Sequence, residues 1–307
     1  MAGGSMMMLI TGTIPDKNLP LTVGEVAADG DYLTVDKQRF ACAQGTGAMI
    51  SAALTVTRYL KLDAPRIVIA GDIGDGDGSR AIYDFLIHSI GKLSPSVLAL
   101  HYWLPDMAQT RRLCEAVDKC AKQPVMIADA ASMYSAKAAG LASRFDVFTP
   151  DATEMAFLAD PGATHPAYIA RHLFNADVTQ TPELAAEAYR LKDAAKLLLS
   201  KGAVDYIVRE GEIIETINEP HVPVLEAIGG TGDTITGLVS ALIYAGLEPH
   251  EAAAIAARAN RTAGEMANAT PATRVIDIIN QLPLVFEQNL CQWSGVCCIE
   301  GGCDDRS

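Results

Sequence analysis

Short apolar runs alternate along the chain with longer segments in which apolar residues recur at helical spacing. The apolar runs predict strands at 9–12, 30–35, 39–42, 65–70, 97–100, 124–128, 147–149, 206–209 and 213–217. The helically spaced segments predict helices at 49–60, 80–93, 107–122, 136–142, 182–200, 234–245, 249–269 and 274–288. Strands that alternate with helices indicate an α/β fold, with a mostly parallel sheet and helices on both of its faces. In such folds a ligand binds outside the carboxyl ends of the strands.

The chain of 307 residues is 50% hydrophobic, which is enough to bury one large core. We expect a single α/β domain over 1–289, followed by a cysteine-rich tail over 290–307. Four of the seven cysteines fall in this tail without the paired spacing of a zinc site, so a flexible, oxidisable tail is favoured over a metal site. The proline-containing segment 161–182 is expected to form an irregular lid or a subunit contact.

Charge narrows the classes of partner. The chain has 24 basic and 37 acidic residues and a formal net charge of −13, which argues against nucleic acid or an anionic membrane as the main partner. The first ten residues have no basic region and no apolar run long enough for a signal peptide or a membrane span. We therefore expect a cytoplasmic protein that binds a small molecule.

The segment Ala227–Gly237 joins a glycine-rich turn, one carboxylate and the start of an apolar helix. Gly230, Thr231 and Gly232 can direct successive N–H groups at an anion, and the positive end of the helix dipole favours the same charge. Asp233 differs from these residues, because its carboxylate is repelled by the negative charge that an anion site attracts. A carboxylate in that place suits a base or a proton carrier. A capping role for Asp233 is the simpler alternative.

This segment resembles the GxGD signature of the ribokinase-like superfamily. Its longer form, Gly-Gly-Thr-Gly-Asp-x-x-x-Gly, is most similar to the ADP- or ATP-dependent NAD(P)H-hydrate dehydratases of the carbohydrate kinase family. The resemblance implies a ribokinase-like three-layer sandwich and a homo-oligomer. It also implies that Gly230, Thr231 and Gly232 form an anion hole, with Gly232 also contacting the nucleotide, and that Asp233 is the catalytic base and contacts the substrate.

Two further segments resemble the nucleotide-binding and metal-binding parts of this family. The family has a Lys-Gly-Ala sequence beside the nucleotide, and it is matched here by Lys201, Gly202 and Ala203. Lys201 could reach a phosphate from that place. Glu154 matches a glutamate that organises Mg²⁺. Asp151 stands where the dehydratases have a substrate-binding His and the kinases an Asn, so substrate contact, Mg²⁺ binding with Glu154 and simple helix capping remain open for it.

Two glycine-containing turns resemble the sequence segments that contact the substrate in this family. In Gly45–Ala48, the resemblance places Ala48 where the backbone meets the nicotinamide, although such a turn is also an ordinary helix start. The loop Gly74–Gly78 resembles the Gly-Pro-Gly-Leu-Gly loop and so places Gly76 at the substrate, with Asp in place of Pro and Leu. A flexible acidic turn is the alternative. Asp129 ends a predicted strand and resembles the second Asp of the family's Asp-Ala-Asp-Ala-Leu sequence. A cap for the next turn is the alternative.

The resemblance implies that ADP or ATP, with Mg²⁺, phosphorylates the hydroxyl of hydrated NAD(P)H, after which phosphate leaves. The alternative is an ATP-dependent kinase of a small hydroxylated molecule, such as a sugar or vitamin precursor, with the same fold and Asp233. A third hypothesis is a nucleotide-binding regulator with a redox-sensitive tail. The six histidines show no ligand spacing and are predicted to be structural or exposed.

Overall fold

The computed structural model describes residues 6–163 and 180–294, which are built around one nine-stranded sheet. Six strands in its centre run parallel to their neighbours and follow the spatial order β10-β9-β8-β7-β1-β6. These strands are β1 (Met8–Ile14), β6 (Arg66–Gly71), β7 (Val97–His101), β8 (Val125–Ala128), β9 (Val147–Phe148) and β10 (Leu197–Ser200). Their carboxyl ends therefore meet at one edge of the sheet, as the sequence predicts.

Antiparallel strands complete the sheet on both sides. At one edge β2 (Thr22–Glu25) pairs with β6, and at the other β11 (Asp205–Arg209) pairs with β10 and with β12 (Glu212–Ile217). A separate three-stranded sheet contains β3 (Ala27–Asp29), β4 (Tyr32–Val35) and β5 (Gln38–Ala41).

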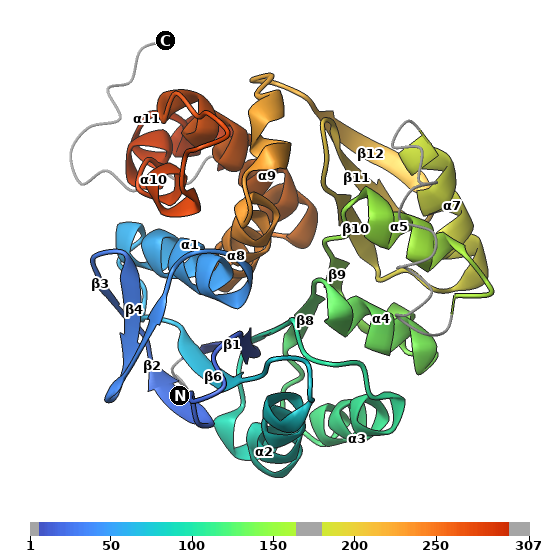
Figure 1. Cartoon of the computed structure of the whole chain (residues 1–307). Coiled ribbons are helices and arrows are strands. Elements are labelled where there is room, and N and C mark those ends of the chain that lie inside the picture. The colour runs from blue at the N-terminus through green and yellow to red at the C-terminus, as the bar shows by residue number, and fades with distance from the viewer. Residues whose placement is uncertain (1–5, 164–179, 295–307) are drawn as a thin grey trace.

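Helices cover both faces of the central sheet (Figure 1). One layer contains α1 (Gly45–Tyr59), α8 (Thr231–Tyr244), α9 (Pro249–Met266), α10 (Val275–Ile279) and α11 (Leu282–Ser294). The other contains α2 (Asp77–Leu93), α3 (Met107–Asp118), α4 (Ala131–Ala138), α5 (Ala152–Ala159) and α7 (Thr181–Leu191). Short 3-10 helices lie at Ala142–Arg144 (η1) and Pro223–Ala227 (η4).

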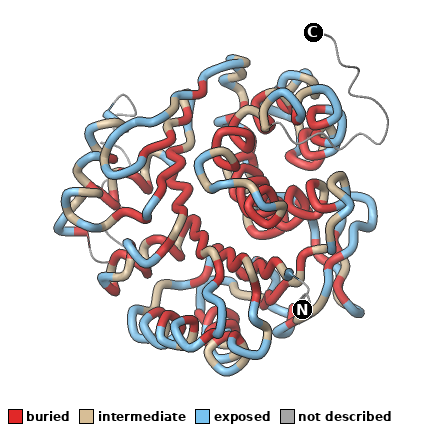
Figure 2. The backbone as a smooth tube through the Cα atoms, turned by 180° about the vertical axis from the view of Figure 1, so that it is seen from behind, coloured by how far each residue is buried: buried red, intermediate tan, exposed pale blue. Residues whose placement is uncertain are grey.

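Strand β7 shows why the sheet is buried on both faces. All five of its residues are buried, and successive side chains point to opposite faces. Val97 and Ala99 join the core under α1, α8 and α9, whereas Leu98 and Leu100 join the core under α2 and α3. Buried segments accordingly run through the middle of the molecule in Figure 2. The predicted three-layer sandwich, with a mostly parallel sheet between two layers of helices, is confirmed.

Helices α1 and α8 pack with their backbones in close approach. A Cβ added to Gly237 would lie 2.2 Å from the carbonyl oxygen of Met49, so only glycine fits there. This contact brings the start of α1 close to the start of α8, at the edge where the parallel strands end.

Several predicted elements differ from the observed ones. The predicted helix 182–200 is wrong at its end, because α7 stops at Leu191 and residues 197–200 form strand β10. The helix predicted at 49–60 begins four residues earlier, at Gly45. Helix α11 continues to Ser294, so the first residues of the predicted tail are helical. The remainder of that tail and most of the predicted lid, 164–179, lie outside the described residues. Within the described part of the chain, no helix is long and apolar enough to cross a membrane.

Candidate active site

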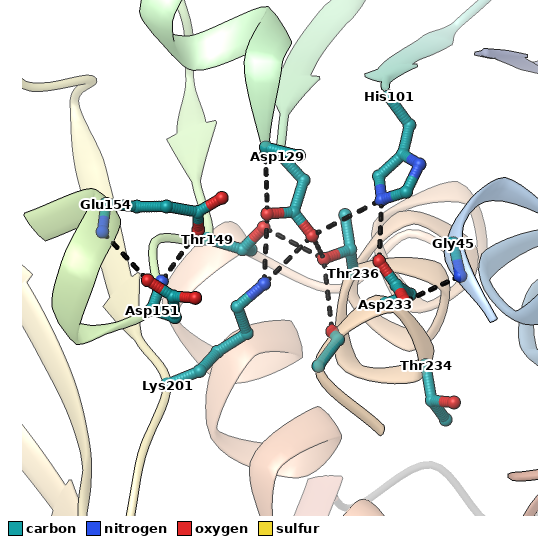
Figure 3. Close-up of polar contacts among 12 residues, drawn as sticks. Gly45, His101, Asp129, Thr149, Asp151, Glu154, Lys201, Asp233, Thr234 and Thr236 are labelled. Carbon is teal, nitrogen blue, oxygen red and sulfur yellow. Dashed lines mark hydrogen bonds and ion pairs between the residues drawn. The ribbon is translucent and has the colours of Figure 1, made fainter. Parts of the chain in front are cut away.

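Four polar side chains stand at the carboxyl ends of neighbouring parallel strands. His101 is the last residue of β7, Asp129 directly follows β8, Thr149 follows β9 and Lys201 follows β10. The sheet order places these residues in a row, and Figure 3 shows them together beside α8, where His101 lies against Asp233 in the first turn of that helix. Residues separated by up to 132 positions in the sequence thus form one polar cluster.

The start of α8 has the backbone geometry of an anion site. Gly230 caps the helix in the left-handed conformation, with φ of 98°, which glycine adopts at no cost. The N–H groups of Gly232 and Asp233 lie in the first turn, where a helix leaves its N–H groups without internal partners. The hydroxyl of Thr231 donates to the carbonyl oxygens of Leu225 and Ile228, so this side chain closes the turn. Any anion there meets backbone N–H groups.

Both carboxylate oxygens of Asp233 are held. Oδ1 lies 2.9 Å from Nε2 of His101, and Oδ2 accepts a hydrogen bond of 2.8 Å from the N–H of Gly45, the first residue of α1. The side chain is 15% exposed. Burial acts to raise the pKa of Asp233, but its interactions with His101, Lys201 and the Gly45 N–H outweigh burial, so the pKa lies below its ordinary value. Asp233 is therefore a fixed, ionised carboxylate at neutral pH.

His101 is the residue that the sequence interpretation missed. It is fully buried, and its second ring nitrogen, Nδ1, lies 3.0 Å from the hydroxyl of Thr46. With a proton on Nε2, the neutral ring donates to Asp233 and accepts from Thr46, so every partner is satisfied. The available signal was its position directly after the predicted strand 97–100, since strand ends carry the site in this fold.

Lys201 is paired with Asp129. Its Nζ lies 2.9 Å from both carboxylate oxygens of Asp129, and its side chain is only 9% exposed. Burial acts to lower the pKa of Lys201, but Asp129 and Glu154 outweigh burial and raise it. The ammonium also lies beside the anion site, because a Cβ added to Gly232 would be 3.6 Å from Nζ.

Asp129 is held by several groups besides Lys201. The hydroxyl of Thr236 and the N–H of Ala130 donate to its carboxylate, and Thr236 also contacts the hydroxyl of Thr149. Ligand atoms of His101, Asp129 and Asp233 lie within 4.8 Å of one another, close enough to share a metal ion. The Lys201 ammonium already neutralises Asp129 at this point, and we therefore do not assign a metal there.

Asp151 and Glu154 form a reciprocal capping box at the start of α5. Each carboxylate accepts a hydrogen bond of 2.8 Å from the backbone N–H of the other residue, so the capping alternative left open for Asp151 is observed. Burial, followed by the carboxylates of Asp151 and Asp129, raises the pKa of Glu154 well above its ordinary value. Each carboxylate keeps a second oxygen, and a cation would relieve the repulsion among them.

The turn after Lys201 is held in place by Arg261 of α9. The guanidinium of Arg261 donates to the carbonyl oxygens of Gly202 and Ala203, and it forms a buried ion pair with Asp205 at 2.7 Å. Gly202 and Ala203 are exposed on this fixed turn, as a nucleotide-binding step requires.

Ala48 and Gly76 stand apart from the cluster around Asp233. Ala48 is completely buried within α1, and the residue of this turn that faces Asp233 is Gly45. Gly76 caps α2 in the loop after β6, two positions from β7 in the sheet. The N–H groups of Gly74, Gly76 and Ser79 in this loop donate to the carboxylate of Asp72, which folds the loop around itself.

Comparisons with known proteins agree on the type of fold and on the family. The family model described as NAD(P)H-hydrate dehydratase matches residues 96–283, which include His101, Lys201 and Asp233. The turns that contain Ala48 and Gly76 lie before this match. An uncharacterised protein of Methanocaldococcus jannaschii is 38% identical over 79% of this chain and 100% of its own length.

Two relatives with assigned names are more distant. The ADP-dependent (S)-NAD(P)H-hydrate dehydratase of Haloterrigena turkmenica is 28% identical over 57% of this chain and 58% of its own length. The structure of the ADP/ATP-dependent NAD(P)H-hydrate dehydratase of Bacillus subtilis superposes with a TM-score of 0.52 at 17% identity, and covers 92% of this chain and 91% of that one. The superposition supports the ribokinase-like fold.

Proposed function

Since the chain belongs to the NAD(P)H-hydrate dehydratase family, we propose that it uses ADP or ATP to dehydrate hydrated NAD(P)H. The nucleotide phosphorylates the ring hydroxyl. The phosphate then leaves with the hydroxyl oxygen, and the neighbouring ring carbon loses a proton, so the ring double bond of NAD(P)H forms again. The observation that carries this proposal is the ionised Asp233, held at both oxygens directly beside the anion site of α8.

Asp233 is the proton acceptor of the reaction. Each of its oxygens keeps a free lone pair after binding His101 and Gly45, so the substrate hydroxyl can donate to it without displacing either partner. Phosphoryl transfer needs positioning more than a strong base, because its transition state is loose. A carboxylate with a lowered pKa but a fixed direction meets that need.

The transferring phosphoryl group lies between the start of α8 and Lys201. The N–H groups from Gly230 to Asp233 bind its oxygens, and the helix dipole adds to this attraction. An ammonium has three N–H donors, and Asp129 accepts two of them, which leaves one for a phosphate. Gly202, Ala203 and Gly232 let the nucleotide approach the backbone.

Mg²⁺ fits the carboxylates of α5. Asp151 and Glu154 offer only oxygen atoms, which Mg²⁺ prefers, and the raised pKa of Glu154 marks a site where added positive charge is favourable. When bound near them, Mg²⁺ would neutralise charge between the nucleotide phosphates. The need for Mg²⁺ and its ligation by these two residues stay predictions. The same holds for a cytoplasmic location and a homo-oligomeric assembly.

The products distinguish this proposal from the alternative, an ATP-dependent kinase of a small hydroxylated molecule. Asp151, in place of the dehydratase His, is the observation that favours the kinase. We expect phosphorus NMR to show one inorganic phosphate for each NADH regenerated from hydrated NADH. A stable phosphorylated substrate with no inorganic phosphate would instead identify a kinase.

His101 is expected to set the acid limit of activity. In His101→Leu, Asp233 loses a donor, so its pKa rises and the acid limb of the kcat/KM profile moves to higher pH. The remaining charged groups that face Asp233, Lys201 and Asp129, are unchanged in this variant. His101→Gln keeps an N–H donor and should restore the wild-type limb. Identical pH profiles in all three proteins would contradict this role.

A further inference from the structure

Tyr102 has an unusual backbone and an exposed aromatic ring beside the polar cluster. It follows His101 at the end of β7, and its φ of 47° lies in the left-handed region that favours glycine. The residue is 49% exposed, so burial of the ring in the core does not account for its presence. Strained residues of this kind concentrate at functional sites.

The ring lies against the two groups that hold Asp233. A Cβ added to Gly45 would be 3.7 Å from the ring carbons of Tyr102, and Gly45 is the backbone donor to Asp233. The ring also meets His101 edge to face, with centroids 4.5 Å apart. The hydroxyl of Thr13 donates to the Tyr102 carbonyl oxygen and so fixes the backbone that aims the ring.

Exposed apolar side chains gather around this position. Of the ten large hydrophobic residues that are exposed in the described part of the chain, three lie between residues 102 and 107, namely Tyr102, Leu104 and Met107. Leu104 is tied to the neighbouring loop, because its N–H donates to the hydroxyl of Ser79. The segment that follows β7 therefore exposes three apolar side chains, the first of them directly beside a cluster that is otherwise polar.

We propose that the Tyr102 ring packs against the hydrated nicotinamide ring of the substrate and so directs the substrate hydroxyl to Asp233. This inference rests on the proposed function, which requires the hydroxyl to reach Asp233. A hydrated nicotinamide ring is uncharged and keeps CH and CH₂ groups that can pack on an aromatic face, so such a face is a favourable neighbour for it. Lys201, which faces the phosphates, follows β10, and this strand lies three positions along the sheet from β7, whose end carries Tyr102.

The test compares KM for hydrated NADH, at saturating nucleotide and Mg²⁺, in wild type and variants of Tyr102. Tyr102→Ala is expected to raise this KM about tenfold, whereas Tyr102→Phe keeps the ring and the wild-type KM. The KM for the nucleotide should not change in either variant. Tyr102→Gly removes the ring but suits the left-handed backbone, so it should show the raised KM with no loss of thermal stability.

Tyr32→Ala is the matched control, because Tyr32 is also exposed but lies on the separate three-stranded sheet. An unchanged KM for hydrated NADH in both Tyr102→Ala and Tyr102→Gly, with an active wild-type enzyme, would overturn the role of Tyr102 alone. A wild-type protein that binds nucleotide but does not act on hydrated NADH would overturn the proposed function, and the assignment of Tyr102 with it.

Discussion

Asp233→Asn is expected to lower the turnover of hydrated NADH about 1,000-fold, because the substrate hydroxyl loses its proton acceptor. The substitution should leave the site intact. An amide oxygen can still accept from the Gly45 N–H, and the amide NH₂ can donate to Nε2 of His101 if the ring takes its other tautomer and donates to Thr46. The measurement is kcat at saturating ADP or ATP.

Nucleotide affinity is the control for Asp233→Asn. The proposed anion site is made of backbone N–H groups and Lys201, all of which remain, so the Kd for the nucleotide measured by calorimetry should stay close to that of wild type. A variant with wild-type kcat would exclude Asp233 from the chemistry. A variant that has lost nucleotide binding would show instead that Asp233 acts on the structure of the site.

Lys201→Met should destabilise the fold more than the other single variants, and it should also lower the affinity for the nucleotide. Asp129 would remain buried without its countercharge, and breaking a buried pair in this way costs about 3 to 5 kcal/mol. A charged donor to phosphate is also lost, so the nucleotide KM should rise about 10- to 100-fold. Chemical denaturation and initial rates measure the two effects.

The double variant Lys201→Met, Asp129→Asn separates these two effects. It removes both buried charges, so much of the lost stability should return. Nucleotide affinity should stay low, because the phosphate still lacks the ammonium. Recovery of both stability and nucleotide affinity in the double variant would show that Lys201 serves only to neutralise Asp129.

Five of the six strands of the parallel core could be predicted, because each is an apolar run too short for a helix and bounded by turn residues. Strand β10 was missed because its run, Leu197–Ser200, directly follows the helical pattern of α7. Helix α7 ends at Leu191, and its C-cap, Lys192, takes the left-handed conformation with φ of 64°. Glycine usually marks such an end, and without it the sequence carries no signal that the helix has stopped.

The candidate site divides in the same way. Asp233 and Lys201 could be selected because each belongs to a local motif with a definite chemistry, and the structure places them together. Asp129 could also be selected, from its place at the end of a predicted strand, but its pairing with Lys201 could not be predicted, since that pairing depends on the order of strands in the sheet. His101 and Asp129 meet the motif residues only because β7, β8 and β10 lie near one another in the sheet. The position of His101 after a predicted strand was a signal, but nothing in the residues around it identifies Asp233 as its partner.

The central claim is a nucleotide-dependent dehydration that requires Asp233. Its most direct test is to mix the purified protein with Mg²⁺ and hydrated NADH, add ADP or ATP, and follow the absorbance of regenerated NADH. We expect the absorbance to rise only when nucleotide is present, and to stay flat with Asp233→Asn. No rise with wild-type protein that binds nucleotide, or an equal rise in Asp233→Asn, would contradict the account.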